Sequence, residues 1–383
     1  MRIKPFKCKD QMKRLITLLI PLFIIASACD GVKLPDDNDN PNTEQPEDKP
    51  GEDPGENPGE NPGENPGENP GENPGENPGE NPGENPGENP GEDPGENPET
   101  KNEVGWFELP LITDTNSDNI IDGSNQLYYA YHLCAGGEKG PNGKKARNYT
   151  VCYSGEYHCP VWVAAPRHKM YVGSSGRNDS YKVDPKIPSN IQYRSTATGE
   201  TDTGDKCNKG HMLGSAERTS SVETNKQVFY YTNIAPQLSS GFNTGGGGWN
   251  LLEDFIDTVV PADTLYEVVG CYFERYTDGY GHTVAPKTIS FGGRKDVAFP
   301  TMYYYAVLRT KKGNTRKSVT ECSADELQCV AFVRSHTNSL KGQKPSSREL
   351  MSISDLEKIT GFTYFSNVPN APKSTYKASD WGL

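Results

Sequence analysis

The chain has 383 residues, a formal net charge of −13 at pH 7 and only 32% hydrophobic residues. Taken as a single number, this charge argues against a partner that is itself an anion, such as a nucleic acid. The charge is unevenly distributed, however. Residues 1–29 carry six basic and one acidic side chain, residues 30–103 carry three and 23, and residues 104–383 carry 30 and 28. The acidity belongs to the middle segment, so only that segment is excluded from binding an anion.

Residues 1–29 are predicted to be a targeting segment. Basic side chains at the start precede a mostly apolar run, Leu15–Ile25, which is too short for a transmembrane helix. The run ends in Ala26-Ser27-Ala28 and Cys29, which resembles a bacterial lipobox. We expect a lipoprotein signal peptide and an extracytoplasmic protein anchored through lipid at Cys29, on the periplasmic or cell-surface face of an outer membrane. An ordinary cleaved signal with an incidental cysteine is the alternative.

Residues 30–103 are predicted to be a disordered acidic linker. From Pro50 to Asn97 the tetrapeptide Pro-Gly-Glu-Asn occurs twelve times, with Asp in the last position at Asp53 and Asp93. The repeat contains no apolar residue, so it has no core to offset the entropy of folding. We interpret it as a spacer, with a binding segment as the alternative.

Residues 104–383 are predicted to form one folded domain. Several aromatic or β-branched runs are typical of strands, and two amphipathic stretches are typical of helices. The expected strands are Leu127–Leu133, Val161–Ala164, Phe229–Tyr231, Leu265–Tyr272, Met302–Leu308 and Val330–Val333, and the expected helices are Asn250–Val260 and Ser354–Thr360, the latter capped by Ser352 or Ser354. This pattern indicates an α+β fold with mostly antiparallel strands.

Seven cysteines lie in this domain, and disulfides are permitted after export. Cys152 with Cys159 and Cys322 with Cys329 are close enough in sequence to close small loops, and the odd number leaves at least one thiol unpaired within the chain. A separate stretch, residues 114–122, resembles the start of a calcium loop. It has Asn119 where the loop needs glycine, so a polar turn is the preferred interpretation.

The side chains that could take part in catalysis are concentrated between residues 205 and 254. His211 is a candidate general base, and Lys209 beside it would suit an anionic substrate. Asn233 and Asn243 offer amide oxygens and Glu253 a carboxylate, ligands that suit Mg²⁺. A base, a cation and a lightly held metal ion together would cleave a phosphodiester. Taken singly, each of these residues also has an ordinary structural interpretation.

Three motifs in this stretch resemble the DNA/RNA non-specific endonuclease family, the ββα-metal nucleases of the Serratia nuclease and endonuclease G type. They are Asn208-Lys209-Gly210-His211, Thr232-Asn233-Ile234-Ala235-Pro236-Gln237, and Asn243 through Trp249 to Leu252-Glu253. Less specific similarity extends over residues 145–368. The resemblance implies a ββα-metal nuclease fold, with a mainly antiparallel central sheet and flanking helices.

The resemblance also implies a role for each candidate residue. His211 would deprotonate the attacking water, and Asn233 would orient the site. Arg177 would neutralise charge that develops on the phosphate, and Lys209 would stand where the family has a second arginine. Asn243 would bind Mg²⁺ directly, with Mn²⁺ or another divalent ion as an alternative, and Glu253 would hold the water shell of the ion.

The sequence departs from the family pattern at three places. Asn208 replaces an aspartate, so that carboxylate is missing or is supplied by Asp205. Lys209 replaces an arginine and loses its two-pronged contact with phosphate. Gly245–Gly248 place Glu253 two residues further from Asn243 than the family pattern does, an insertion that glycines could accommodate as a bulge.

The sequence therefore predicts a lipid-anchored, metal-dependent endonuclease that acts on DNA and RNA. The alternative is a surface lipoprotein that uses a nuclease-like scaffold for binding, with weak or no catalysis. The two differ in whether His211, Asn243 and Glu253 come together at one site.

Overall fold

The computed structural model describes residues 106–383 except 125, 141 and 142. The predicted signal peptide (1–29) and the acidic repeat linker (30–103) lie outside these residues. Within the described part of the chain, no helix is both long enough and apolar enough to cross a membrane.

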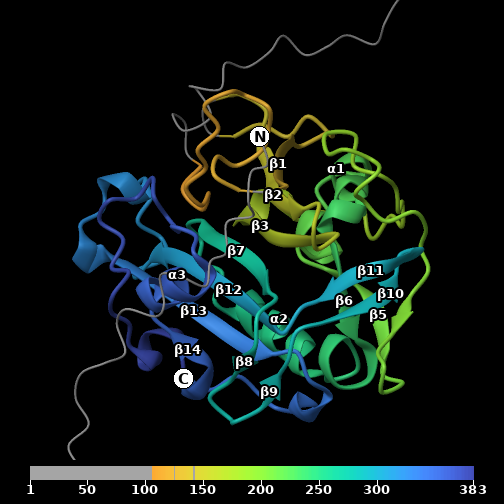
Figure 1. Ribbon diagram of the computed structural model, residues 1–383. Helices are drawn as coiled ribbons and strands as arrows, with labels where there is room; N and C mark the ends of the chain where they lie inside the picture. Colours follow the sequence, from red (N-terminus) through yellow and green to blue (C-terminus); the bar gives the residue numbers. More distant parts are fainter. Residues whose placement is uncertain (1–105, 125, 141–142) are drawn as a thin grey trace, which may run out of the picture. The chain divides into compact units, whose positions relative to one another are not determined.

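A seven-stranded antiparallel sheet is the largest element of the structure (Figure 1). Every residue of its strands β2, β3 and β13 is buried. Strands β3 and β13 are therefore mostly apolar without alternation, whereas β2 buries polar side chains as well, among them Arg147 and Asn148. The strands, in their order across the sheet, are β1 (Leu127–Leu133), β2 (Arg147–Ser154), β3 (Cys159–Arg167), β7 (Leu265–Tyr272), β12 (Met302–Thr310), β13 (Leu327–Ser335) and β14 (Leu350–Met351).

A second, five-stranded antiparallel sheet carries the motif residues. Its order is β11 (Arg294–Phe299), β10 (Lys287–Phe291), β4 (Gly199–Glu200), β5 (Lys206–His211) and β6 (Ile234–Leu238). A hairpin is formed by β8 (Tyr276–Thr277) and β9 (Thr283–Val284). The α-helices are α1 (Val222–Gln227), α2 (Gly248–Thr258) and α3 (Ile353–Thr360), and a π-helical turn covers Ser239–Asn243. Short 3₁₀ turns cover Lys169–Tyr171, Ser215–Arg218, Tyr231–Asn233, Val319–Glu321, Ala324–Glu326, Asn338–Leu340, Ser347–Glu349 and Ala378–Trp381.

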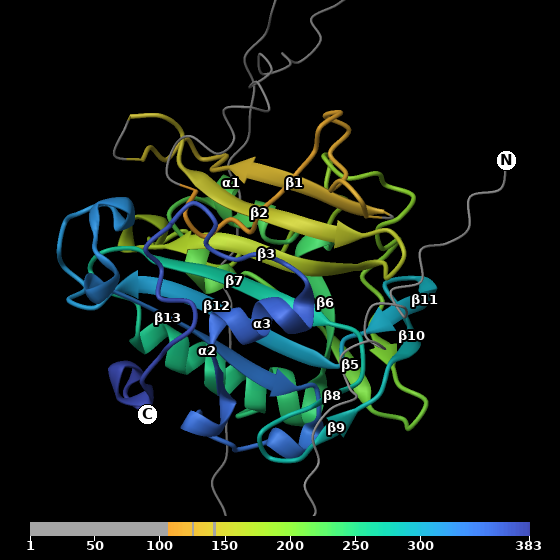
Figure 2. The same cartoon turned by 60° about the vertical axis from the view of Figure 1, so that its left-hand side comes forward.

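Helix α2 packs on one face of the large sheet, and the segment following α3 packs on the other (Figure 2). Trp249 of α2 stacks on Tyr305 of β12 with ring centroids 4.9 Å apart. The next residue back along the strand, Tyr304, points to the opposite face, where its hydroxyl lies 2.8 Å from that of Tyr364. The predicted α+β class, with a mainly antiparallel sheet flanked by helices, is confirmed.

Most of the elements expected from the sequence are present. Leu127–Leu133 and Leu265–Tyr272 match β1 and β7, and three other expected runs lie inside β3, β12 and β13. The two expected helices correspond to α2 and α3, and the side chain of Ser352 caps α3 by accepting from the main-chain N–H of Asp355.

The prediction of a strand at Phe229–Tyr231 was wrong. The main-chain N–H groups of Phe229 and Tyr230 bond back to Lys226 and Gln227, which continues the turn that ends α1. The run is apolar because it is buried, and its contact with a neighbouring segment is a single parallel bridge between Tyr230 and Lys182. Burial in a turn and burial in a strand give the same composition over three residues.

The seven cysteines of the domain are free and buried, so neither expected disulfide forms. Cys152 lies opposite Trp162 in the β2–β3 pair, while Cys159 lies opposite Ser154. The register of these strands therefore keeps the two thiols out of a directly paired position.

The stretch 114–122 forms a tight polar turn. The carboxylate of Asp114 accepts hydrogen bonds from the main-chain N–H groups of Asp118 and Asn119 and from the hydroxyl of Tyr129. Asn119 has a φ of 62°, a left-handed conformation that asparagine tolerates better than most residues. Hydrogen bonds within the turn therefore explain why aspartates occur at these positions, without a bound calcium ion.

Candidate active site

Two of the sequence motifs lie on one antiparallel pair of strands. In β5 and β6, His211 lies opposite Ile234 and Asn208 lies opposite Gln237. The side chain of Gln237 crosses Gly210, where an added Cβ would lie 2.1 Å from Cδ of the glutamine. Glycine before the histidine is therefore required by the packing of Gln237.

His211 lies at the end of β5 against two aromatic rings. Its ring centroid is 4.8 Å from that of Phe229 and 5.9 Å from that of Tyr181. Its Nε2 is buried and has no hydrogen-bond partner among the described residues. Burial, followed by the positive charges of Arg177 and Lys209, lowers the pKa of the imidazole to about 3. The ring is therefore neutral near pH 7, which is the form that a general base requires.

The two predicted cations, Arg177 and Lys209, both lie beside His211. The guanidinium of Arg177 is 4.9 Å from the centroid of the Phe229 ring, the same ring that contacts His211. It is exposed and forms an ion pair with Asp179 at 2.9 Å. Lys209 is on β5, two residues before His211. The site therefore presents positive charge next to a neutral base.

Asn233 is fully buried and does not face the open side of the site. Its Oδ1 accepts from the main-chain N–H of Leu213 at 3.0 Å, and its Nδ2 donates to the main-chain oxygens of Leu213 and Val228 at 3.0 and 2.7 Å. These hydrogen bonds hold the main chain just after His211 in place. Asn233 is therefore fixed by main-chain contacts around the candidate base.

A buried aspartate connects the segment of Arg177 to the same motif. Asp184 lies 3.0 Å from Nε2 of His132 and accepts a hydrogen bond from the Thr232 hydroxyl at 2.7 Å. Burial would raise the pKa of the Asp184 carboxyl, but its interactions with His132, the main-chain N–H of Lys186 and Thr232 together lower it. This contact explains the threonine before Asn233, because it fastens the loop that bears Arg177 to the core.

Asn243, at the end of the π-helical turn, is oriented by the two strands. Its Nδ2 donates a hydrogen bond to Oε1 of Gln237, which fixes the orientation of the amide. Its Oδ1 accepts a long hydrogen bond, 3.4 Å, from Nδ2 of Asn208. Asn243 is half-buried, so its amide oxygen remains available as a ligand.

Asp205 does not supply the carboxylate that the motif lacks at Asn208. One of its oxygens accepts from Nδ2 of Asn338 at 2.9 Å and the other from the hydroxyl of Thr203 at 2.8 Å. Of the two possibilities left open by the sequence, the structure therefore favours a missing carboxylate, with Asn208 contacting Asn243 in its place.

The glycine run between Asn243 and α2 forms the bulge that was expected. Gly245 and Gly246 have φ of 61° and 76°, and an added Cβ at either would meet nothing within 4 Å. Gly247 differs, because an added Cβ would lie 2.4 Å from the main-chain oxygen of Phe242. The inserted residues project outward, while the start of α2 stays close to the π-helical turn.

Glu253 lies on α2, one turn after the buried Trp249. Loss of water around the carboxyl raises its pKa to about 8, and the negative charges of Glu217 and Asp257 add to this effect. Trp249 and Arg167 act in the opposite direction but do not cancel it. A carboxyl group crowded in this way is stabilised by a cation.

These residues fit a lightly held divalent ion. The amide oxygen of Asn243, which is half-buried, and the carboxylate of Glu253 are the hard oxygen ligands that Mg²⁺ prefers. Among the described residues, no three histidine, cysteine, aspartate or glutamate side chains gather as a metal-binding group. An ion at this site would therefore keep most of its water ligands, as Mg²⁺ commonly does.

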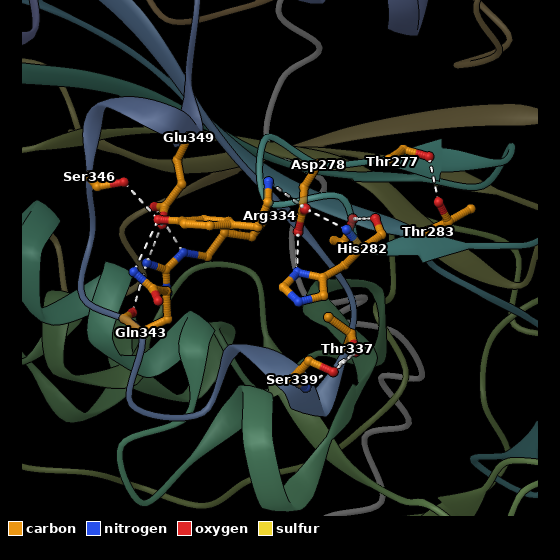
Figure 3. A network of polar contacts seen from close by, with 12 residues as sticks. Thr277, Asp278, His282, Thr283, Arg334, Thr337, Ser339, Gln343, Ser346 and Glu349 are labelled. Carbon is orange, nitrogen blue, oxygen red and sulfur yellow. Dashed lines mark hydrogen bonds and ion pairs between the residues drawn. The ribbon is translucent and has the colours of Figure 1, made fainter. Parts of the chain in front are cut away.

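A buried arginine fixes the beginning of α2. Arg334 forms two hydrogen bonds with Glu349, at 3.0 and 2.8 Å (Figure 3), and neither side chain is exposed by more than 1%. The same guanidinium donates to the main-chain oxygens of Gly248 and Gln343. Arg334 thereby joins β13 to the first residue of the helix that carries Glu253.

We expect Arg334→Met to lower the free energy of unfolding by about 3–5 kcal/mol, because it leaves Glu349 buried without its partner. Adding Glu349→Gln should recover part of this loss, since no unpaired charge would remain. Urea unfolding of both variants measures the effect, with the exposed Arg348→Met as the control. Equal losses in the single and double variants would contradict this account.

His336 supports the other end of the site. It is 1% exposed, accepts from the main-chain N–H of Leu238 at 2.8 Å and bonds the oxygen of Pro300 through Nδ1 at 2.9 Å. Its ring stacks on Phe299 with centroids 4.2 Å apart. Burial, with a smaller effect of the Lys287 charge, lowers the pKa of His336 to about 3. The end of β6 therefore depends on a neutral histidine.

This histidine should make the protein less stable as the pH falls. The unfolded chain takes up a proton at His336 below about pH 6.5, whereas the folded chain resists protonation until about pH 3. His336→Gln, which keeps a donor and an acceptor, should reduce the stability lost between pH 7 and 4.5 by about 2–3 kcal/mol. Urea unfolding at both pH values measures this. His282→Gln, on the β8–β9 connection, is the control, and an unchanged loss in His336→Gln would contradict the prediction.

Several residues of the site were not identified from the sequence. Gln237 was recognised only as part of a motif, and the contributions of Tyr181, Phe229 and Arg334 were not predicted. Tyr181 follows Arg177 by four residues, which was the only local signal. The others reach the site through contacts between distant parts of the chain.

Known proteins that resemble this chain in sequence are nucleases. The sequence model of a family described as DNA/RNA non-specific endonuclease matches residues 132–371. "Nuclease EXOG, mitochondrial" of Danio rerio is 27% identical over 233 residues, which cover 60% of this chain and 62% of the relative. The Mus musculus protein of the same name is 25% identical over 231 residues, which cover 59% and 57%. The match therefore spans less than two thirds of these relatives' length. A chain in a crystal structure of the EndoG/EndoGI complex is 20% identical, covers 57% of this chain and 84% of that chain, and has a TM-score of 0.43.

Proposed function

Because the chain belongs to the DNA/RNA non-specific endonuclease family, we propose that it hydrolyses phosphodiester bonds within DNA and RNA with the help of a divalent metal ion. One observation carries this proposal: the imidazole of His211 contacts the rings of Phe229 and Tyr181, and these same two rings contact Arg177 and Lys209. A neutral base next to two positive charges suits a substrate that is an anion and a reaction that consumes water.

His211 supplies the base in the proposed reaction. Its neutral ring takes a proton from the attacking water as the bond between the water oxygen and phosphorus forms. The bond between phosphorus and the leaving oxygen breaks, and that oxygen takes a proton from solvent. His211 then returns its own proton to solvent, so that one water is consumed for each bond cut. Arg177 and Lys209 stabilise the negative charge that develops on the phosphate oxygens.

Asn243 and Glu253 are the proposed metal-binding residues. Asn243 would bind the ion through its amide oxygen, and Glu253 would hold the water shell of the ion through its carboxylate. The bound ion, Mg²⁺ in the first instance, would stabilise the charge of the leaving oxygen. Gln237 orients the amide of Asn243 by accepting from its nitrogen.

Cleavage of a closed circle tests the proposal, because a circle has no end from which an exonuclease could start. We expect the full chain to convert a circular plasmid to linear and shorter products, and to degrade a single-stranded RNA, when Mg²⁺ is present and not when a chelator is added. Mn²⁺ should substitute for Mg²⁺. Failure to cut either substrate with any of several divalent ions would instead support a nuclease-like binding protein.

We further propose that the nuclease domain, residues 104–383, is tethered to a membrane by a lipid on Cys29, with residues 30–103 as the spacer. The basic start, the short apolar run and the small residues before Cys29 support this. Labelling with a radioactive fatty acid should mark the wild-type protein and not Cys29→Ser. Equal labelling of both would contradict the proposal.

A further inference from the structure

Tyr181 is a side chain that both cations of the site share. It is half-buried and lies four residues after Arg177, in the long connection between β3 and β4. Its hydroxyl accepts a hydrogen bond from Nη2 of Arg177 at 3.3 Å. Nζ of Lys209 lies over its ring, 4.6 Å from the centroid. One phenol thus contacts two positive charges that come from separate parts of the chain.

The ring of Tyr181 is itself fixed relative to the base. It meets Phe229 edge-on with centroids 5.1 Å apart, and Phe229 meets His211 in the same way at 4.8 Å. The rings of Tyr181 and His211 are 5.9 Å apart. This three-ring cluster sets the distance from the imidazole to the phenol, and through the phenol to both cations.

Each cation also has a partner of its own, since Arg177 pairs with Asp179 at 2.9 Å and Lys209 donates to the main-chain oxygen of Thr196 at 3.4 Å. Neither of these partners joins the two cations to each other, and two adjacent cations on flexible side chains repel each other. A tyrosine counters this with two different groups, since the ring face attracts an ammonium and the hydroxyl oxygen accepts from a guanidinium. Phenylalanine would keep the ring face for Lys209 and lose the acceptor for Arg177, whereas leucine would lose both. The contributions of the two contacts can therefore be separated by substitution.

We infer that Tyr181 is a positioning residue that holds Arg177 and Lys209 together on one side of His211, and so sets where a phosphate of the nucleic acid binds. The inference rests on the proposed function, because it concerns the substrate of the same site. It adds a residue that acts through the two cations and not on the reacting atoms.

A double-mutant cycle in the full chain tests this. We expect Tyr181→Phe to lower kcat/KM for a single-stranded DNA by about 3–10-fold and Tyr181→Leu by about 10–100-fold. In an Arg177→Met background, Tyr181→Phe should change kcat/KM by less than about 2-fold, because its partner is already gone. In a Lys209→Met background it should keep its full effect.

The matched control is Tyr376→Phe, since Tyr376 is 40% exposed and its hydroxyl donates to the main-chain oxygen of Leu350. It should cut at the wild-type rate. Effects of Tyr181→Phe and Arg177→Met that multiply would overturn the inference, as would wild-type activity in Tyr181→Leu. A merely structural role would lower the melting temperature without this dependence on Arg177.

A binding measurement separates this inference from the proposed function. In chelator, a fluorescent 12-nucleotide single-stranded DNA should bind Tyr181→Leu more weakly than wild type. The slope of log K against log salt should also fall in magnitude by about 1, because about one phosphate contact is lost. If wild type binds but does not cut, this result would uphold the role of Tyr181 while the proposed function fails. An unchanged slope, or no binding by wild type, would overturn the role of Tyr181.

Discussion

Replacing His211 by alanine should lower kcat for plasmid cleavage by about 10²–10⁴-fold, the range typical for loss of a general base. The ring is neutral near pH 7 because burial and two nearby cations lower its pKa to about 3. Its loss removes the proton acceptor without removing the positive charges that bind phosphate. KM should therefore change much less than kcat. Initial rates over a range of plasmid concentrations measure both constants.

The matched control is His282→Ala. His282 is paired with Asp278 on the β8–β9 connection (Figure 3), and its side chain is 32% exposed. This variant should cut at the wild-type rate, and both variants should keep the wild-type circular dichroism spectrum. If His211→Ala is folded and cuts normally, His211 is not the base, whatever the activity of the wild-type chain.

Replacing Glu253 by glutamine should raise the Mg²⁺ concentration that gives half-maximal rate by about 10–100-fold. The carboxyl lies among other negative groups, and its pKa is raised to about 8 in the absence of a metal ion. The amide would relieve that crowding but would bind the water shell of a cation more weakly. We therefore expect Glu253→Gln to melt at a higher temperature than wild type without metal. We also expect it to gain less from added Mg²⁺.

The neighbouring acid provides the control for this substitution. Asp254 is exposed on the same helix, so Asp254→Asn makes the same chemical change one residue away. Its Mg²⁺ requirement should equal that of wild type. If both variants shift alike, the effect is a general change in surface charge, and Glu253 does not hold the metal. Asn243→Ala should show the larger loss of Mg²⁺ response expected for a direct ligand.

Five of the seven strands of the large sheet could be predicted from the sequence, because local patterns specify them, whereas β2 and β14 were not predicted. Strands such as Leu265–Tyr272 are apolar runs of the right length, and α2 has apolar residues at helical spacing. The order of the motifs also identified His211, Asn243 and Glu253 as candidate site residues. Phe229–Tyr231 shows where this approach fails, since a buried turn has the same composition as a short strand.

The support of the site could not be predicted in the same way, because it depends on contacts between residues far apart in the sequence. Arg334 reaches Gly248 across 86 residues, and His336 reaches Leu238 across 98. A single buried polar side chain, such as Arg334 or His336, does not change the hydrophobic periodicity of the sequence, so its burial cannot be predicted from that pattern. The role of Asp205 could not be predicted either, because its carboxylate accepts a hydrogen bond from a residue distant in sequence, Asn338.

The proposed function depends most directly on a divalent ion that Asn243 would bind through its amide oxygen and Glu253 would hold through water. Crystals of the protein soaked in Mn²⁺ and measured for anomalous scattering would locate the ion directly. The account predicts a single strong peak about 2.1 Å from Oδ1 of Asn243, with Glu253 contacting water molecules around it. A peak elsewhere, or none at Mn²⁺ concentrations that support full cleavage, would contradict it.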